Sequence, residues 1–312
     1  MTVSNHKVEI MATLWPEMEH YKFFAADPRL SGIRLNTAKA KVTTIRYLTE
    51  MAVRQSFGTP IYFDVKGRQL RVAKVIPNDE NLEIILNHPI TVETPCIVLF
   101  KGGTDPAVLA RTEGKHLTFE GGPQFMVTPG DSLNVRAPYE VHGNLFPKKQ
   151  LYFLKVALEA GIKRFMLSYA RSEEEIEELR SVVGDDCEIF AKIEDQKGLD
   201  FVKSDYHSRK NDYRLLNARG DLFVELDKPH EIIKATRDLI KLDSRAIAGS
   251  RILLSVTEEE VPSCADLNEV AFLLGVGYRR FMFCDGLCLD KEALDRSITI
   301  LATILEDFGY AI

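Results

Sequence analysis

The chain alternates between short apolar runs of strand length and longer segments whose apolar residues recur every three or four positions. Residues 9–14, 30–36 and 61–65 are apolar runs, and residues 38–56 carry apolar side chains at helical spacing. Strands that alternate with helices pair in parallel, because each helix carries the chain back to the start of the next strand. The amino-terminal part of the chain therefore predicts βαβ units.

The same alternation returns at residue 147, where a proline suits the first turn of a helix. Five further strands are predicted, at residues 163–169, 187–193, 213–216, 246–250 and 280–284. Helices are predicted at residues 147–158, 172–183, 229–242, 264–274 and 291–308, and Ser172 opens the second of them with a capping box. Eight strand–helix units are enough to close a parallel barrel, so we predict an α/β fold of the TIM (β/α)8 class.

The alternation is interrupted after the third strand. Residues 82–86, 97–100 and 132–135 are short strand candidates, separated by glycine- and proline-rich turns, and no amphipathic helix is evident among them. We therefore predict a small all-β lid domain at residues 72–146, inserted into a barrel formed by residues 1–71 and 147–312.

Composition limits the partners of the chain. Its 312 residues are 45% hydrophobic and can bury a large core, while a net charge of -6 and the absence of a basic run argue against nucleic acid. No apolar run approaches the roughly 20 residues that span a bilayer, and residues 1–22 lack the layout of a signal peptide. We therefore expect a cytoplasmic protein with no membrane partner.

Several common site motifs are missing from the sequence. The five cysteines are scattered without C-x-x-C spacing, and the seven histidines form no H-x-x-H or H-E-x-x-H pattern. Neither the G-x-G-x-x-G nor the G-x-x-x-x-G-K-[ST] motif of nucleotide-binding folds is present. A zinc hydrolase, a disulfide framework and a Rossmann or Walker-type site are therefore not expected.

Candidate chemistry gathers at the carboxyl ends of the predicted strands, where barrel enzymes carry their active sites. The polar residues at those ends are Arg34, Asn36, Asp64, Lys66, Arg71, Lys192, Glu194, Arg219, Asp221, Ser250, Arg251 and Asp285. Cations accompanied by carboxylates suit an anionic, phosphorylated or carboxylated substrate bridged by a divalent ion.

Each of these residues also has a purely structural explanation. Lys192 and Glu194 project from the same face of one strand and could form an internal salt bridge. In the same way, Arg34 could pair with Asp64, and Asn36 could cap the helix that follows it. From the spacing alone, a metal site and a set of internal ion pairs both remain open.

Six segments in order along the chain resemble signature motifs of the pyruvate kinase family. They are MATLWP at residues 11–16 (family ATIGP), IRLNTAK at 33–39 (ARLNFSH), FDVKGRQLR at 63–71 (LDTKGPEIR), AKIE at 191–194 (SKIEN), ARGDL at 218–222 (ARGDL) and PSCADLNEVA at 262–271 (PTRAEVSDVA). Collinear matches are more specific than any single motif. The resemblance implies a TIM barrel interrupted after its third strand by a β lid.

The resemblance also implies a metal centre and its neighbours. Glu194 and Asp221 would hold Mg²⁺ or Mn²⁺, and the ion would bridge oxygens of the substrate. Lys192, with Arg34 and Arg71, would stabilise the transferred phosphoryl group and the enolate, because phosphoryl transfer depends on positioning and charge neutralisation.

The same resemblance assigns the binding of the rest of the substrate. The backbone of Ala218, Arg219, Gly220 and Asp221 would receive the substrate carboxylate. Ser250 stands where the family has a threonine near the enolate carbon, so it joins the implied catalytic residues.

The family's potassium site is altered in this chain. Ala38 and Val65 replace its serine and threonine, whereas Asn36 and Asp64 remain as a residual monovalent-cation site. Gln69 stands where a glutamate marks potassium dependence. We therefore expect that potassium is not required, and that the ammonium of Lys39 takes over its charge.

Other departures concern the substrates. Lys39 also stands at a histidine position near the nucleotide, so it is counted, together with Asn36, among the substrate-binding residues. Phe223 and Trp15 replace glycines, and Arg251 replaces a glutamine and adds a cation that could pair with an extra carboxylate. The family's carboxyl-terminal domain has no counterpart in the sequence, so we expect no sugar-phosphate activation of that kind, while a homo-oligomer remains open.

Three functions remain open. The first is a phosphotransferase that acts on phosphoenolpyruvate, or a related enolpyruvyl or 2-oxo acid, together with ADP or ATP. The second is a metal-dependent lyase or aldolase that uses pyruvate-enolate chemistry on the same barrel. The third is a non-catalytic homologue that binds phosphoenolpyruvate.

Overall fold

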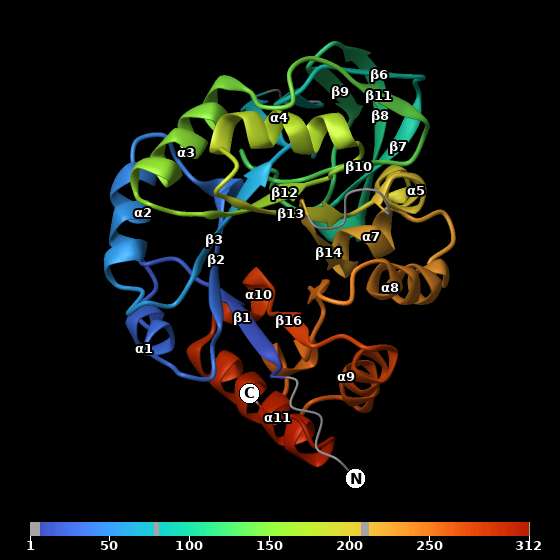
Figure 1. Ribbon diagram of the computed structural model, residues 1–312. Helices are drawn as coiled ribbons and strands as arrows, with labels where there is room; N and C mark the ends of the chain where they lie inside the picture. Colours follow the sequence, from blue (N-terminus) through green and yellow to red (C-terminus); the bar gives the residue numbers. More distant parts are fainter. Residues whose placement is uncertain (1–6, 78–80, 207–211, 312) are drawn as a thin grey trace.

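The computed structural model describes residues 7–77, 81–206 and 212–311. Eight parallel strands close into a barrel in the order β1-β16-β15-β14-β13-β12-β3-β2 (Figure 1). They are β1 (Glu9–Thr13), β2 (Gly32–Asn36), β3 (Ile61–Lys66), β12 (Arg164–Ser168), β13 (Glu188–Ile193), β14 (Arg214–Ala218), β15 (Ile247–Gly249) and β16 (Arg280–Met282). The predicted TIM barrel is confirmed.

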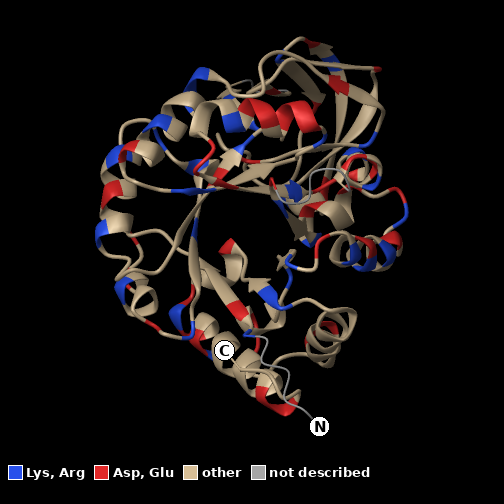
Figure 2. Cartoon of the chain, in the orientation of Figure 1, with Lys and Arg blue, Asp and Glu red and all other residues tan. Residues whose placement is uncertain are grey.

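Helices surround the barrel (Figure 1). They are α1 (Tyr21–Ala25), α2 (Ile45–Arg54), α3 (Lys148–Glu159), α4 (Glu173–Val183), α5 (Gln196–Ser204), α7 (Arg219–Glu225), α8 (Glu231–Leu242), α9 (Cys264–Val276), α10 (Asp285–Cys288) and α11 (Lys291–Asp307). Figure 2 shows the acidic residues gathered along α4. The Ser172 side chain accepts a hydrogen bond from the Glu175 backbone N–H at the start of α4, as the capping box predicts.

The prediction was wrong for two helical segments. Residues 38–56 do not form one helix: a 3₁₀ turn, η1 (Thr37–Lys39), precedes α2, which begins only at Ile45. The Asn36 side chain caps η1 by accepting from the Ala38 N–H, which turns the chain before the helix can begin. Helix α5 was missed, because it is short and contains a glycine, although Asp195 caps it by accepting from the Gly198 N–H.

An all-β unit is inserted between β3 and α3. A six-stranded antiparallel sheet runs in the order β10-β7-β8-β9-β5-β4, and β11 pairs with β6 beside it. The strands are β4 (Val72–Ile76), β5 (Leu82–Leu86), β6 (Ile90–Val92), β7 (Cys96–Phe100), β8 (Asp105–Glu113), β9 (His116–Glu120), β10 (Asn134–Val135) and β11 (Tyr139–Val141). The sequence predicted only three of these strands, because the others are short or interrupted by polar residues. We keep residues 72–146 as the proposed extent of this lid.

The lid has its own core and touches the barrel at α7. Its buried side chains form a separate apolar cluster that includes Phe100 and Phe119. The Asn134 amide donates a hydrogen bond to Glu225 at 2.5 Å, and the Arg136 guanidinium donates to the Val224 carbonyl at 2.8 Å. The lid therefore rests on the helix that follows β14, at the carboxyl end of the barrel.

Inside the barrel, an apolar plug separates the two ends. A small buried cluster fills the interior: Met11, Tyr62, Met166, Phe190, Leu216, Ala218, Ile247 and Met282. Polar side chains above this plug therefore face the lid rather than the barrel interior. Among the described residues, no helix combines the length and apolar character needed to cross a membrane.

Candidate active site

A cavity of about 180 Å³ lies at the carboxyl ends of the barrel strands, below the lid. Its lining residues are Arg34, Asn36, Lys66, Gln69, Arg71, Ser132, Lys192, Glu194, Ala218, Asp221, Ser250, Met282 and Asp285. The structure thus brings together most of the residues that the sequence placed at strand ends. Gln69 and Ser132 were not predicted to line it, and Ser132 belongs to the lid, where no motif marks it.

Asp64 is the centre of the charge network beneath this cavity. Its carboxylate is fully buried; Oδ1 accepts from Lys66 Nζ at 2.8 Å and from Ser168 Oγ at 2.9 Å. Its other oxygen, Oδ2, accepts from Lys192 Nζ at 3.1 Å and from Arg34 Nη2 at 2.5 Å. Burial opposes ionisation, but these cations outweigh it and hold the pKa of Asp64 well below its usual value. Asp64 therefore fixes three cations at the mouth of the barrel.

The two residues expected to form a residual monovalent-cation site, Asn36 and Asp64, already accept hydrogen bonds from the protein. Asn36 Oδ1 accepts from the Ala38 N–H at 3.1 Å, and Asn36 Nδ2 donates to Asp285 at 2.8 Å. Both structural explanations, an Arg34–Asp64 pair and an Asn36 cap, are thus present in the molecule.

The expectation that the Lys39 ammonium takes over the potassium charge is not met, whereas its expected role in substrate binding stays a prediction. Its ammonium does not approach Asn36 or Asp64, but pairs with Asp131 of the lid at 2.9 Å, and its side chain is 68% exposed. The 3₁₀ turn η1 ends at this residue, which directs the side chain toward the lid. The buried cations in contact with Asp64 are instead Arg34, Lys66 and Lys192, and burial lowers the pKa of Lys66 in spite of its contact with Asp64.

Lys192 and Glu194 face the cavity from β13. Lys192 Nζ lies 3.0 Å from Glu194 Oε1 and donates to Ser168 Oγ at 2.9 Å. Burial disfavours its charged form, but Asp64 and Glu194 outweigh this effect and raise the pKa of Lys192. The ammonium is therefore held charged at neutral pH.

Glu194 has one oxygen that the protein leaves open. Oε2 accepts from the Tyr169 N–H at 2.7 Å, whereas the buried Oε1, although close to Lys192, accepts no well-aligned hydrogen bond from a described residue. Burial raises the pKa of Glu194 against the effect of Lys192, and the nearby Asp221 carboxylate adds to the rise. A buried carboxylate oxygen that accepts no well-aligned hydrogen bond can serve as a ligand to a cation.

Asp221 lines the same cavity from the first turn of α7. Within the described chain, no group of three or more His, Cys, Asp or Glu side chains could hold a metal ion. Glu194 and Asp221 together supply two carboxylates, so a hard divalent ion bound here would take its remaining ligands from substrate and water. Such an open ligand set is typical of Mg²⁺ sites that act on phosphorylated substrates.

The segment from β14 into α7 lies close to Ser250. Ala218 is the N-cap of α7, and a Cβ added at Gly220 would stand 3.2 Å from the Ser250 Cβ. The first N–H groups of a helix have no partner inside it, so this turn offers donors to an anion. Ser250 itself adopts a left-handed backbone conformation with φ of 64° and lines the cavity.

Arg219 lies apart from the other predicted residues. Its guanidinium donates to Glu269 at 2.8 Å and to the Ser250 carbonyl at 2.5 Å, and the side chain does not line the cavity. Arg219 therefore holds the loop after β15 in place. Sequence reasoning could not decide this orientation, because Glu269 lies in α9, far along the chain.

Arg71 reaches the cavity from the root of the lid. Its Nε donates to Gln69 Oε1 at 2.9 Å, and its Nη1 donates to the Gly130 carbonyl at 2.5 Å. Gln69, which the sequence marked only as a departure from the potassium-dependent pattern, thus orients the Arg71 guanidinium. Arg251 stays outside the cavity lining, with its guanidinium 4.7 Å from the centre of the Phe223 ring.

A second cavity of about 440 Å³ adjoins the first, between the β2–α2 loop, α3 and the lid. Five of its lining residues are cations and none is a carboxylate; the cations are Lys39, Lys41, Lys66, Arg71 and Lys149. Lys66 and Arg71 line both cavities. No sequence pattern indicated Lys41 or Lys149, because neither lies at a strand end.

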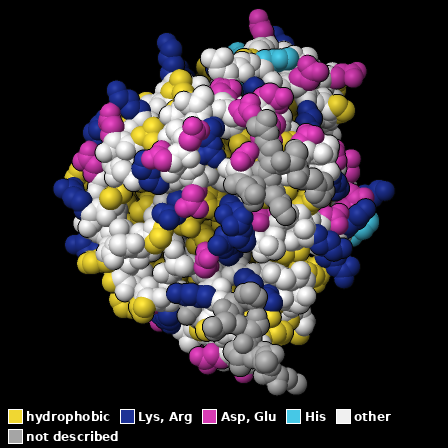
Figure 3. Space-filling model, in the orientation of Figure 1, with side chains coloured by type: hydrophobic (Ala, Val, Ile, Leu, Met, Phe, Trp, Pro, Cys, Tyr) yellow, Lys and Arg dark blue, Asp and Glu magenta, His cyan; other side chains and the backbone are white. Residues whose placement is uncertain are grey.

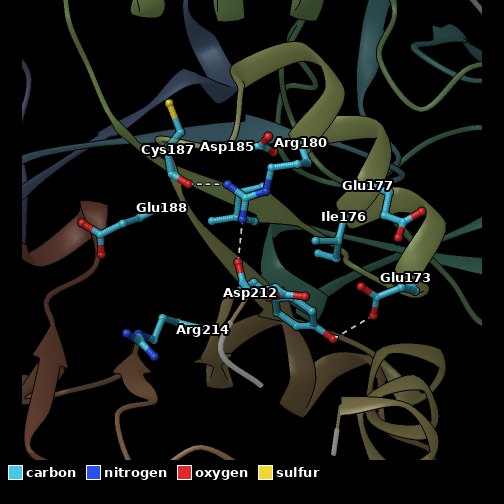
Figure 4. A pocket seen from close by; sticks show the side chains of 11 residues that line it. Glu173, Ile176, Glu177, Arg180, Asp185, Cys187, Glu188, Asp212 and Arg214 are labelled. Carbon is cyan, nitrogen blue, oxygen red and sulfur yellow. Dashed lines mark hydrogen bonds between the residues drawn. The ribbon is translucent and has the colours of Figure 1, made fainter. Parts of the chain in front are cut away.

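A larger hollow, of about 500 Å³, lies at the amino ends of β13 and β14 (Figure 4). In Figure 4 the Arg180 guanidinium reaches the Cys187 and Asp212 carbonyls and donates hydrogen bonds to both. The Tyr213 hydroxyl donates to Glu173 at 3.3 Å. These groups tie β13, β14 and α4 together at the end of the barrel that usually serves stability, so we place the active site at the opposite end.

The chain is similar to proteins named pyruvate kinase, although no protein-family model matches it. It is 24% identical to the pyruvate kinase of Methanocaldococcus jannaschii over 97% of this chain and 71% of that protein. It is 24% identical to the pyruvate kinase of Thermoplasma acidophilum over 85% of this chain and 51% of that protein. The match to the pyruvate kinase of Borreliella burgdorferi has 24% identity, over 85% of this chain and 60% of that protein. The chain thus spans about half to seven-tenths of the length of these relatives.

Proposed function

Since the chain is a divergent relative of the pyruvate kinases, we propose that it is a magnesium-dependent phosphotransferase. Its substrates would be phosphoenolpyruvate, or a related enolpyruvyl or 2-oxo acid, and a nucleotide of the ADP/ATP type. The observation that carries this proposal is the pair of adjoining cavities that share Lys66 and Arg71. A phosphoryl group that passes between two anionic molecules needs cations at the boundary between them.

The smaller cavity suits the enolpyruvyl substrate. Lys192 is buried and held charged by Asp64, so it can neutralise negative charge on the phosphoryl group before transfer and on the enolate oxygen after it. Arg71, oriented by Gln69, and Arg34, oriented by Asp64, add two guanidinium groups on the same wall.

The carboxylate and the reacting carbon of the substrate meet the other wall. The turn formed by Ala218, Arg219, Gly220 and Asp221 offers backbone N–H donors for the carboxylate. The Ser250 side chain lies beside this turn and can hold a proton near the enolate carbon. The substrate would thus be oriented between β13, β14 and β15.

Mg²⁺, or Mn²⁺ in its place, fits Glu194 and Asp221, because the buried Oε1 of Glu194 accepts no well-aligned hydrogen bond from a described residue, although the Lys192 ammonium lies 3.0 Å away. When bound, the ion would act as a Lewis acid toward the substrate oxygens.

The larger of the two adjoining cavities, which lies between the β2–α2 loop, α3 and the lid, suits the polyphosphate of a nucleotide. Its five cations and the absence of a lining carboxylate produce a positive field next to the site of transfer. Lys149 and Lys41 would contact the terminal phosphates. Lys39 also lines this cavity, but its ammonium already pairs with Asp131 of the lid.

We further propose that potassium is not required. The oxygens of Asp64 and the side-chain oxygen of Asn36 already accept hydrogen bonds from the protein. Arg34 and Lys192, rather than Lys39, supply positive charge beside Asp64, and Lys66, whose pKa burial lowers to about 7, also donates a hydrogen bond to it. A potassium ion would have to displace these donors before it could bind.

On the face shown in Figure 3, Lys and Arg side chains are interspersed with Asp and Glu side chains. This mixture of charges supports small-molecule partners rather than nucleic acid. Separately, we propose a cytoplasmic location.

The experiment follows the purified protein with Mg²⁺, phosphoenolpyruvate and ADP by phosphorus NMR. Phosphotransfer predicts the resonances of ATP. A parallel proton NMR sample contains pyruvate and the metal. If ATP is absent from the first sample, and if the methyl protons of pyruvate in the second exchange with solvent only when the metal is present, the lyase or aldolase alternative replaces this proposal. Binding of phosphoenolpyruvate without either reaction would identify a non-catalytic homologue.

A further inference from the structure

Asp285 brings a third carboxylate into the smaller cavity. It is the first residue of α10, separated from β16 by two residues, and its side chain is 49% exposed. Its Oδ2 lies 3.1 Å from Arg34 Nη1, and its Oδ1 lies 2.8 Å from Asn36 Nδ2. A carboxylate thus occupies two donors of the wall that we assign to the substrate anion.

These contacts leave Arg34 with little capacity for another anion. Its Nε and Nη2 donate to Asp64, and its Nη1 donates to Thr13 Oγ1 at 3.2 Å and to Asp285. Of these three partners, Asp285 alone lines the cavity. A substrate anion that approaches Arg34 must therefore either displace the Asp285 carboxylate or share the guanidinium with it.

The charge of the cavity leads to the same conclusion. Four cations line it, and they are Arg34, Lys66, Arg71 and Lys192. If Glu194 and Asp221 neutralise a divalent ion, Asp285 and the buried Asp64 are the carboxylates that remain to oppose those cations. With all four cations charged, an excess of two positive charges remains, and it would be three without Asp285; both values fall by one where Lys66, whose pKa burial lowers to about 7, is neutral. A phosphoenolpyruvate trianion exceeds the smaller value, whereas a dianionic acid matches it.

We propose that Asp285 is a specificity-determining residue that occupies an anion position on Arg34 and Asn36 and thereby favours dianionic acids over trianionic ones. The inference rests on the proposed function, because it assumes that the substrate anion and the metal bind in this cavity. Asp285 limits affinity for the most highly charged substrates while it holds Arg34 and Asn36 in place.

The test measures the binding of two anions, phosphoenolpyruvate and oxalate, by calorimetry at pH 8, low salt and saturating Mg²⁺. Asp285→Asn keeps the size of the side chain and removes its charge, and Asp285→Ala removes the whole group. Both variants are expected to bind phosphoenolpyruvate about tenfold more tightly than the unmodified protein, because a negative charge a few ångströms from the anion is removed. Oxalate, with one charge fewer, is expected to gain less.

The matched control is Glu9→Gln, which removes a carboxylate that pairs with Arg280 at 2.9 Å at the opposite end of the barrel. It should leave both affinities unchanged. Unchanged or weaker binding of phosphoenolpyruvate by both Asp285 variants, or equal gains for the two anions, would overturn the inference and leave the proposed function intact. If the unmodified protein bound neither anion with Mg²⁺, the proposed function would fail together with it.

Discussion

Lys192 Nζ lies 3.1 Å from Asp64 Oδ2 at the mouth of the barrel, and both side chains are almost fully buried. Burying an ammonium costs free energy unless a carboxylate compensates its charge. Asp64 provides that compensation from β3, which is separated from β13 by β12 in the barrel. Lys192 is thereby fixed next to Glu194 with its charge intact. This relationship makes Lys192 the residue on which the proposed chemistry depends most.

Lys192→Met should lower the rate of phosphoryl transfer by at least about a hundredfold, because a preorganised charge that stabilises the transition state is lost. Steady-state kinetics with phosphoenolpyruvate and ADP would measure the effect, and circular dichroism would check the fold. Lys163→Met is the matched control, since Lys163 is half exposed and pairs with Asp186 away from the site. Equal rates for the Lys192 variant and the control would remove the proposed site.

Lys149→Ala should raise the KM for the nucleotide about tenfold and leave the KM for phosphoenolpyruvate nearly unchanged, because Lys149 lines only the larger cavity. The loss of one charge contact to phosphate accounts for this size. Lys155→Ala on the same helix is the control, since that side chain is 69% exposed and pairs with Glu159. A parallel rise in both KM values would argue that the two cavities do not bind separate substrates.

Replacing sodium by potassium should change the rate by less than about twofold, because Asp64 is already compensated by Lys66, Lys192 and Arg34. The measurement is the initial rate at constant ionic strength in each salt. Strong activation by potassium would show that the internal cations do not replace it.

Protein stability should depend on pH through His88. Burial lowers the pKa of this residue from its usual 6.5 to about 4, although its hydrogen bond to the Gly67 carbonyl opposes the shift. The unfolded chain takes up a proton below pH 6.5, whereas the folded chain does not until about pH 4. The free energy of unfolding should therefore fall as the pH drops through this window, by up to about 1.4 kcal/mol per pH unit.

Urea unfolding at several pH values would test this dependence. In His88→Gln the contribution of this histidine to the pH dependence should disappear. The free energy of unfolding should therefore fall less steeply between pH 6.5 and 4 than in the unmodified protein. His230→Gln, at an exposed position, should keep the original slope. An unchanged slope in the His88 variant would contradict the assignment.

The sequence predicted the barrel because each of its strands is an apolar run followed by a polar residue at the carboxyl end. Lys192 and Glu194 were found in this way, since two-residue spacing on a strand places them on one face. Arg34 and Asp64 were found for the same reason, although the sequence could not tell whether they contact a substrate or each other. The structure shows that they contact each other.

Contacts between distant elements were beyond the sequence. The bond between Asp285 and Arg34 joins residues 251 positions apart, and nothing in the local pattern of either residue indicates it. Lys39 was misplaced because η1 directs it toward Asp131 of the lid, a segment whose strands were only partly predicted. The resemblance assigned the backbone of Arg219 to the substrate carboxylate, and this role stays a prediction. The orientation of its side chain toward Glu269 and the Ser250 carbonyl could not be predicted from the sequence.

The most direct test of the central claim compares the rate of ATP formation from phosphoenolpyruvate and ADP in the unmodified protein and in Asp221→Asn, with Mg²⁺ present. Asp227→Asn serves as the control, because Asp227 is exposed just after α7. We predict that the unmodified protein and the control form ATP, that chelation of the metal stops the reaction, and that Asp221→Asn is slower by at least about a hundredfold. Absence of ATP from the unmodified protein, or an equal rate in Asp221→Asn, would contradict the account.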